Sequence, residues 1–196
     1  MRDMKTVSSI NGFTLPELMV TLAVASILLA VAVPGFKGMV STNQIAAQSN
    51  SLLTSLTVAR SEASKRGFKV AICAHNASTA CAMNTSCCSG SNDWATGWII
   101  FVDQNDNGAF DDNNDVNLCE VDAGGIPVED CLVRTSGPLT GKTTLVGSSG
   151  VLRYSASGEV DSSVSFTLTP NDCTGDQKTI IGISSVGRSH AYAAPC

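Results

Sequence analysis

The sequence predicts an α+β protein in which a long N-terminal helix packs on a largely antiparallel β-sheet domain. Two observations lead to this fold class. The chain opens with a long apolar run and continues with apolar residues at helical spacing, and from residue 68 onward short β-like runs are separated by Gly, Asn, Asp and Ser. Strands and helices do not alternate in this second part. The predicted segments are residues 1–12, 13–33, 34–67 and 68–196.

Composition narrows the classes of function. Charged residues make up 15% of the 196 residues and hydrophobic residues 43%, which excludes a disordered chain. The net charge of −5 and the pI of about 4.8 argue against a protein that grips nucleic acid over a broad basic face. With two histidines, the chain has little capacity for a histidine-based metal centre or general base.

The first segment of interest is the apolar run of 21 residues at 13–33, whose only charged residue is Glu17. As a helix it would be about 32 Å long, close to the thickness of the hydrocarbon layer of a bilayer. Arg2 and Lys5 precede it, so we expect the N-terminus in the cytoplasm and the rest of the chain exported. A cleaved secretory signal and a plain membrane anchor are the alternatives, but neither explains a carboxylate inside the run.

The residues around this acid, Gly12-Phe13-Thr14-Leu15-Pro16-Glu17-Leu18, resemble the cleavage and methylation motif of type IV pilins and type II secretion pseudopilins. The resemblance implies that a prepilin peptidase cuts after Gly12, removing the leader 1–12, and that Phe13 is N-methylated. It also implies that Glu17 pairs with the N-terminal amine of a neighbouring subunit. Opposite charges attract strongly in a low-dielectric helical bundle, so such a pair would fix axial register. Pro16 departs from the family pattern, but proline is tolerated in a first helical turn.

The helix should continue beyond the apolar run over residues 34–67. Pro34 and Gly35 predict a kink or a melted segment at its start. Further along, Gly67 is a predicted C-cap, preceded by basic residues that favour the end of a helix. The apolar stripe that should pack on the following domain consists of Ile45, Leu52, Leu56, Ala59 and Ala63.

The second part of the chain is predicted to form strands at 68–73, 97–103, 131–135, 151–156, 164–169 and 179–185. Several pieces of the chain, taken in order, resemble the GspH/FimT type of minor pilin. They are Ala59-Arg60-Ser61-Glu62-Ala63, Lys65-Arg66-Gly67, Cys73, the run 97–103 with Asn107-Gly108, and Gly187-Arg188. This resemblance implies a pilin-like fold and a minor, low-copy subunit rather than the major fibre protein.

All eight cysteines follow the apolar run and would therefore be exported, where disulfides form. The spacing does not favour zinc. Connectivity does not follow from the sequence, but our hypothesis pairs Cys173 with Cys196 and Cys119 with Cys131. The remaining four, Cys73, Cys81, Cys87 and Cys88, would then pair among themselves.

An acidic turn between two predicted strands resembles the start of an EF-hand loop, with side-chain oxygens from Asp103, Asn105, Asn107 and Asp111. The twelfth position is Asn114 rather than the usual bidentate Glu. A polar hairpin turn is the favoured interpretation, because Asn-Gly is a strong turn signal. Residues 93–130 carry ten acidic residues and no Lys or Arg, which we interpret as a solvated loop rather than a cation or partner site. We expect no cofactor, with Ca²⁺ as the alternative.

Near the C-terminus, Gly187-Arg188-Ser189-His190 resembles the Gly-Arg-x-Arg ending of DNA-binding minor pilins, with a histidine in place of the second arginine. Arg188 and Lys178 are the candidate DNA contacts, with Arg153 as a further contributor. DNA binding stays an alternative, because neutral histidine attracts phosphate weakly. No nucleophile, P-loop or dinucleotide motif is present, so we expect no enzymatic activity.

Together these features predict a minor pilin or pseudopilin anchored in the bacterial inner membrane, with its C-terminal domain in the periplasm. It would assemble into, and help to prime, a type IV pilus or a type II secretion filament. The implied partners are other pilin subunits, the prepilin peptidase and the inner-membrane assembly platform. A DNA-capturing minor pilin and a calcium-dependent adhesive tip subunit are the alternatives. The sequence does not distinguish the two filament types, the position in the filament or the neighbouring subunits.

Overall fold

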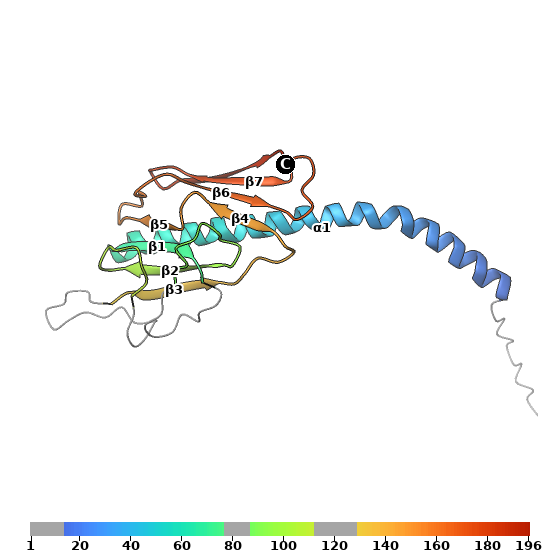
Figure 1. Cartoon of the computed structure of the whole chain (residues 1–196), viewed down its shortest axis with the longest axis horizontal. Helices are drawn as coiled ribbons and strands as arrows, with labels where there is room; N and C mark the ends of the chain where they lie inside the picture. Colours follow the sequence, from blue (N-terminus) through green and yellow to red (C-terminus); the bar gives the residue numbers. More distant parts are fainter. Residues whose placement is uncertain (1–13, 77–86, 112–128) are drawn as a thin grey trace, which may run out of the picture. The chain divides into compact units, whose positions relative to one another are not determined.

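The computed structural model describes residues 14–76, 87–111 and 129–196, which form one long helix and eight strands (Figure 1). Helix α1 spans Leu15–Arg66 and accounts for all the helical structure in the described ranges. The strands are β1 Lys69–Ala74, β2 Trp98–Asp103, β3 Cys131–Ser136, β4 Thr144–Gly147, β5 Val151–Tyr154, β6 Val164–Thr169, β7 Lys178–Ile183 and β8 Ser189–Ala194. The chain divides into two compact units, Met1–Ser41 and Thr42–Cys196.

Helix α1 continues without interruption through Pro34 and Gly35, so the melted segment that was one of the two predictions for this position is wrong. Proline removes one hydrogen-bond donor, and a long helix can absorb that loss without ending. The helix begins with the N–H of Leu18 donating to the carbonyl of Thr14. Pro16 therefore lies in the first turn, where its missing N–H costs no hydrogen bond.

The second unit contains the C-terminal part of α1, and the predicted stripe faces its core. All five stripe residues are buried, with exposed fractions of 6% or less. The helix ends at Gly67, which has a φ of 76° and donates its N–H to the carbonyl of Ala63. This left-handed conformation favours glycine, so the predicted C-cap is confirmed.

Two antiparallel four-stranded sheets make up the rest of this unit. The first has the order β3-β2-β1-β5. Its central strands β1 and β2 are buried along almost their whole length, which explains why their sequences are continuous apolar runs. The pairing of β2 with β3 shifts register between Ile100 and Phe101, where the bulge leaves Val133 without a partner in the ladder.

The second sheet has the order β4-β6-β7-β8, with all neighbours antiparallel. Its two edge strands were not predicted from the sequence. Strand β4 is only four residues long, and β8 is a largely exposed strand in which three of the six residues are alanine. Edge strands that are short or exposed lack the apolar alternation on which strand prediction depends.

One buried cluster joins α1 to both sheets. It contains the helix stripe together with large side chains such as Trp94, Trp98, Tyr154 and Phe166. Trp94 meets Phe166 edge to face, with ring centroids 4.8 Å apart. A smaller cluster around Ile99, Phe101 and Phe110 covers the other face of the first sheet. The α+β fold class is thus confirmed, with two sheets sharing one main core.

Candidate functional site

The first candidate site is the apolar segment of α1. Residues Leu15–Ala32 have a mean hydropathy of 2.1, long and apolar enough to cross a membrane, and none of this window is buried within the protein. The exposed fraction of the large apolar side chains in this window lies between 52%, for Val24, and 77%, for Val31. A soluble domain rarely presents so much continuous apolar surface to water. The segment therefore needs a partner outside the chain.

Glu17 is the acidic residue in the first turn of α1, and it is exposed. It makes no hydrogen bond or ion pair with any described residue. The positive end of the helix dipole favours an acid at this position, but a carboxylate in an apolar surrounding requires a charged partner. Gly12 and Phe13, the predicted cleavage and methylation residues, lie outside the described residues.

The cysteines are oxidised in the described part of the chain. Cys173 bonds to Cys196, the pairing expected from the sequence, and fixes the C-terminus beside Gly175. Cys73 of β1 bonds to Cys88, two of the four cysteines expected to pair among themselves. Cys87 and Cys131 are also disulfide-bonded. Cys119, the expected partner of Cys131, and Cys81, the fourth member of the other group, lie outside the described residues.

The acidic turn after β2 uses its polar side chains to hold its own backbone. Asp103 accepts the N–H groups of Asn107 and Gly108 at 3.1 and 3.0 Å. Asn105 and Asn107 both donate side-chain amide protons to Asp111. The four predicted calcium ligands therefore lie in one loop, but their hydrogen bonds are those of a closed polar turn. Among the described residues, no group of three or more His, Cys, Asp or Glu side chains is arranged to hold a metal.

An ion-pair network fastens this turn to the first sheet. Arg153 of β5 lies 3.0 Å from Asp106, 2.8 Å from Asp161 and 3.8 Å from Asp103. Lys69 of β1 also contacts Asp106, at 2.7 Å. Asp106 has a positive φ of 62°, so its contacts with Lys69 and Arg153 hold an unusual backbone conformation in place. Arg153 is thus engaged within its own domain and is not presented for DNA.

A buried acid that sequence analysis missed supports the same turn. Asp130 is 1% exposed and accepts the N–H groups of Gln104 and Asp111 at 2.8 and 3.1 Å. Burial raises the pKa of Asp130 to about 6, with further repulsion from Asp103 and Asp111. Burial raises the pKa of Asp103 as well. The sequence did not distinguish Asp130, because it is one of ten acidic residues between 93 and 130 and no local pattern shows which of them are buried.

The predicted DNA contacts do not come together. On the β7–β8 hairpin, Ile183 pairs with Ser189 and Lys178 pairs with Ala194. Lys178 therefore lies at the opposite end of the hairpin from Arg188. The distance along β7 from Ile183 to Lys178 is about 16 Å, at ~3.3 Å per residue. His190 stacks on Tyr192, with centroids 6.1 Å apart, and these two rings line a different depression from the one that Arg188 lines.

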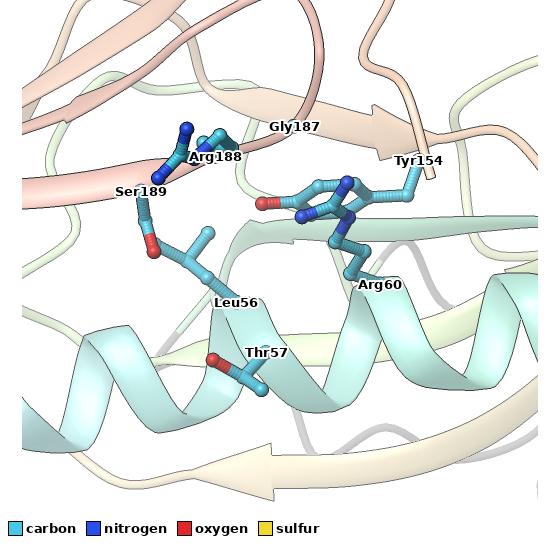
Figure 2. A pocket seen from close by; sticks show the side chains of 7 residues that line it. All are labelled: Leu56, Thr57, Arg60, Tyr154, Gly187, Arg188 and Ser189. Carbon is cyan, nitrogen blue, oxygen red and sulfur yellow. The ribbon is translucent and has the colours of Figure 1, made fainter. Parts of the chain in front are cut away.

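Arg188 instead borders a pocket of about 220 Å³ between α1 and the β7–β8 turn (Figure 2). The lining residues are Leu56, Thr57, Arg60, Tyr154, Gly187, Arg188 and Ser189. Gly187 has a φ of 74°, and its N–H donates to the carbonyl of Ser184 at 2.7 Å. A side chain at 187 would also collide with the backbone of Gly158, so glycine is required to place Arg188 at this rim. Sequence analysis did not connect Arg60 and Tyr154 with Arg188.

Comparison with known families identifies the class of protein. The model of the family described as type II transport protein GspH matches residues 48–187, and the prokaryotic N-terminal methylation motif matches residues 8–33. The chain therefore belongs to the GspH family, within the type IV pilin superfamily. Members of this family are structural filament subunits rather than enzymes. Among curated protein sequences, none matches the chain at a significant level.

The fold is similar to two crystal structures of the type IV minor pilin FimU from Pseudomonas aeruginosa strain PAO1. The first is 19% identical, with a TM-score of 0.51, covering 78% of this chain and 93% of that chain. The second, from another crystal form, is 17% identical with a TM-score of 0.45 over 80% and 96% of the two chains. The first similarity confirms the pilin-like α+β fold.

Proposed function

We propose that this protein is a minor subunit of a type IV pilus or a type II secretion filament that helps to prime filament assembly. The observation that carries the proposal is the apolar, exposed segment Leu15–Ala32, with Glu17 in its first turn and no partner for that acid among the described residues. A helix that is hydrophobic all round is stable when it is surrounded by lipid or by other helices. A filament subunit needs both surroundings in succession.

The membrane stage comes first. Residues 13–33 hold the precursor in the inner membrane, with the leader 1–12 in the cytoplasm and residues 68–196 in the periplasm. The prepilin peptidase then cuts between Gly12 and Phe13, and the new N-terminus is methylated. Cleavage creates a positively charged amine four residues before Glu17. The disulfides found in the domain fit an oxidising compartment.

The filament stage exchanges lipid for neighbouring helices. Because hydrocarbon is as apolar as the helix itself, burial alone gives little specificity to this exchange. The carboxylate of Glu17 supplies this specificity, because a carboxylate is stable in an apolar bundle only when a charged group such as a neighbour's N-terminal amine contacts it. The assembly platform would drive extraction. The folded domain, held outside the helical core, would choose the adjacent subunits.

The two alternatives have less support from the placement of the residues. DNA capture would rest on Arg188 without Lys178 or His190 beside it. Calcium-dependent adhesion would require the closed turn at 103–111 to exchange its internal hydrogen bonds for metal ligation. We therefore propose assembly as the main role, without a cofactor.

The test follows the full-length chain with a C-terminal epitope through its host cell. We expect it in the membrane fraction and in sheared surface filaments or secretion filaments, with Phe13 as its N-terminal residue in mass spectrometry. Inactivating the prepilin peptidase should retain leader 1–12 and remove the chain from filaments. Deleting the chain should reduce the number of filaments if it primes assembly. A chain that stays in membranes while filament number is unchanged would contradict the proposal.

A further inference from the structure

The pocket between α1 and the β7–β8 turn contains two arginines and no acid. Arg60 comes from the helix and Arg188 from the turn, and none of the seven lining residues is Asp or Glu (Figure 2). Neither guanidinium forms an ion pair with a described residue. By contrast, Arg66 and Arg153, which lie elsewhere on the same domain, are both paired with carboxylates. Two like charges lining one pocket repel each other unless an anion lies between them.

Each arginine is held in position by the backbone around it. Arg60 donates a hydrogen bond from Nη2 to the carbonyl of Val186 at 3.0 Å, and its side chain packs over Gly158. A guanidinium has five N–H groups, so most of the donors of Arg60 stay available. Arg188 follows the left-handed Gly187 directly, which fixes its backbone at the pocket rim. The side chain of Arg60 is therefore held in place, whereas Arg188 is exposed and is positioned through its backbone.

Tyr154 adds a third hydrogen-bond donor to the lining of the pocket. The residue is 1% exposed as a whole, and its hydroxyl, which lies at the pocket, makes no hydrogen bond with any described residue. The hydroxyl points into the pocket, toward the side lined by Arg188 and Ser189 (Figure 2). Burial raises the pKa of Tyr154 to about 12, so the group is a proton donor at any physiological pH. Since this donor has no acceptor among the described residues, it is available to a ligand in the pocket.

The geometry points to an anion site in which Arg60, Arg188 and the hydroxyl of Tyr154 bind a carboxylate side chain of a neighbouring filament subunit. Planar guanidinium groups match the two oxygens of a carboxylate, and the tyrosine hydroxyl adds a third donor. Ser189 at the rim offers one more hydroxyl. This inference rests on the proposed function, since the carboxylate is supplied by an adjacent subunit.

Charge favours a single carboxylate over a polyanion. The chain has a net charge of −5, so a nucleic acid would meet general repulsion, whereas one acidic side chain needs only the local field of two arginines. A volume of about 220 Å³ fits one side-chain head group. The predicted additional cation for DNA, Lys178, lies at the far end of the hairpin. The pocket thus lacks the extended basic surface that a phosphate backbone would use.

The test converts this contact into a covalent bond. Filaments carrying the full-length Arg188→Lys variant are sheared from cells and treated with a water-soluble carbodiimide, which couples an amine to a carboxylate in direct contact with loss of one water. We expect mass spectrometry to find an amide between position 188 and an Asp or Glu of an adjacent pilin subunit. The matched control is Arg134→Lys on β3, because Arg134 is also exposed and without an ion pair among the described residues.

The expected yield of intersubunit product is at least about fivefold higher from position 188 than from position 134, since direct ion pairs hold the reacting groups together. Arg60→Lys gives the same test from the opposite wall of the pocket. Incorporation of these variants without intersubunit coupling from position 188 or position 60 would overturn the inference. So would coupling that is equally strong from position 134, or failure of both pocket variants to couple because neither enters filaments that contain the wild-type chain.

A further arm separates the carboxylate from nucleic acid. A short duplex DNA is added in excess before the carbodiimide, and we expect the coupling from position 188 to be unchanged. Loss of that coupling, together with DNA retention that Arg188→Ala abolishes, would assign the pocket to phosphate and overturn the inference. Absence of the wild-type chain from all filaments is a distinct result, and it would contradict the proposed function instead.

Discussion

The two halves of helix α1 differ in how they use apolar residues. Between residues 15 and 32, apolar side chains surround the helix and none of the window is buried. Between residues 45 and 63, apolar side chains recur on one stripe and all are buried against the two sheets. One continuous helix therefore carries two patterns with two kinds of partner. The partner of the second half is within the chain, whereas the first half requires lipid or other subunits.

The largest expected effect comes from truncating the same residue type in each half. Leu52 is 0% exposed and Leu22 is 62% exposed. We expect Leu52→Ala to lower the free energy of unfolding of the domain by about 2–5 kcal/mol, because it removes buried methyl groups and leaves a cavity. Leu22→Ala should change it by less than about 0.5 kcal/mol. The measurement is denaturant unfolding of the full chain in detergent, followed by the fluorescence of the buried Trp94 and Trp98. Equal losses of unfolding free energy in the two variants would contradict the conclusion that only the second half of the helix packs within the chain.

The next largest expected effect is a pH dependence of stability, which comes from an acid of the folded domain and not from the acid of the apolar segment. Asp130 lies in the domain core region and is hydrogen-bonded to two backbone N–H groups, while Glu17 has no partner among the described residues. The pKa of Asp130 is raised to about 6 from an ordinary value of 3.8, so the folded state holds this proton more tightly than the unfolded state. The contribution of Asp130 to stability should therefore be fully present below about pH 4 and be lost as the pH rises through about 6, by up to about 3 kcal/mol.

Asp130→Asn tests this sign. The variant should lose most of the difference between urea midpoints at pH 4.5 and pH 7. A residual slope is expected in the same direction, since burial also raises the pKa of Asp103. Glu62 and Asp106 have lowered pKa values, so their contributions are lost as the pH falls through the range below their ordinary values. An unchanged midpoint difference in Asp130→Asn would show that this carboxyl does not govern the pH response.

A smaller effect is expected from the ion-pair network of the domain. Arg153→Met removes the cation shared by Asp103, Asp106 and Asp161. We expect a loss of about 1–2 kcal/mol in unfolding free energy at neutral pH, because Asp103 is buried while the other two acids are partly exposed. Lys178→Met, which breaks no ion pair among the described residues, is the control. A loss no larger than the control's would show that the acidic turn holds itself through its own hydrogen bonds.

Sequence patterns predicted the parts of this molecule that depend on local chemistry. The helix stripe, the Gly67 cap and the six main strands follow from periodicity and backbone preference. The exported compartment predicts disulfides but not their pairing, so the Cys173–Cys196 bond was a hypothesis that the structure confirms. The short and exposed strands β4 and β8 were missed because they carry no apolar alternation. The arginine pocket was missed for another reason. Tertiary packing of α1, β5 and the β7–β8 turn brings together Arg60, Tyr154 and Arg188, and no motif or spacing along the chain predicts that these residues are close.

The most direct test of the account is the fate of Glu17→Ala in cells. The full-length variant is compared with wild type in isolated membranes and in sheared filaments by immunoblot, with Glu159→Ala as a control on the exposed surface of the domain. We predict unchanged membrane insertion and at least about tenfold less variant in filaments, since the helical bundle loses the charge that fixes subunit register. Wild-type levels of Glu17→Ala in filaments would contradict the claim that this carboxylate directs assembly.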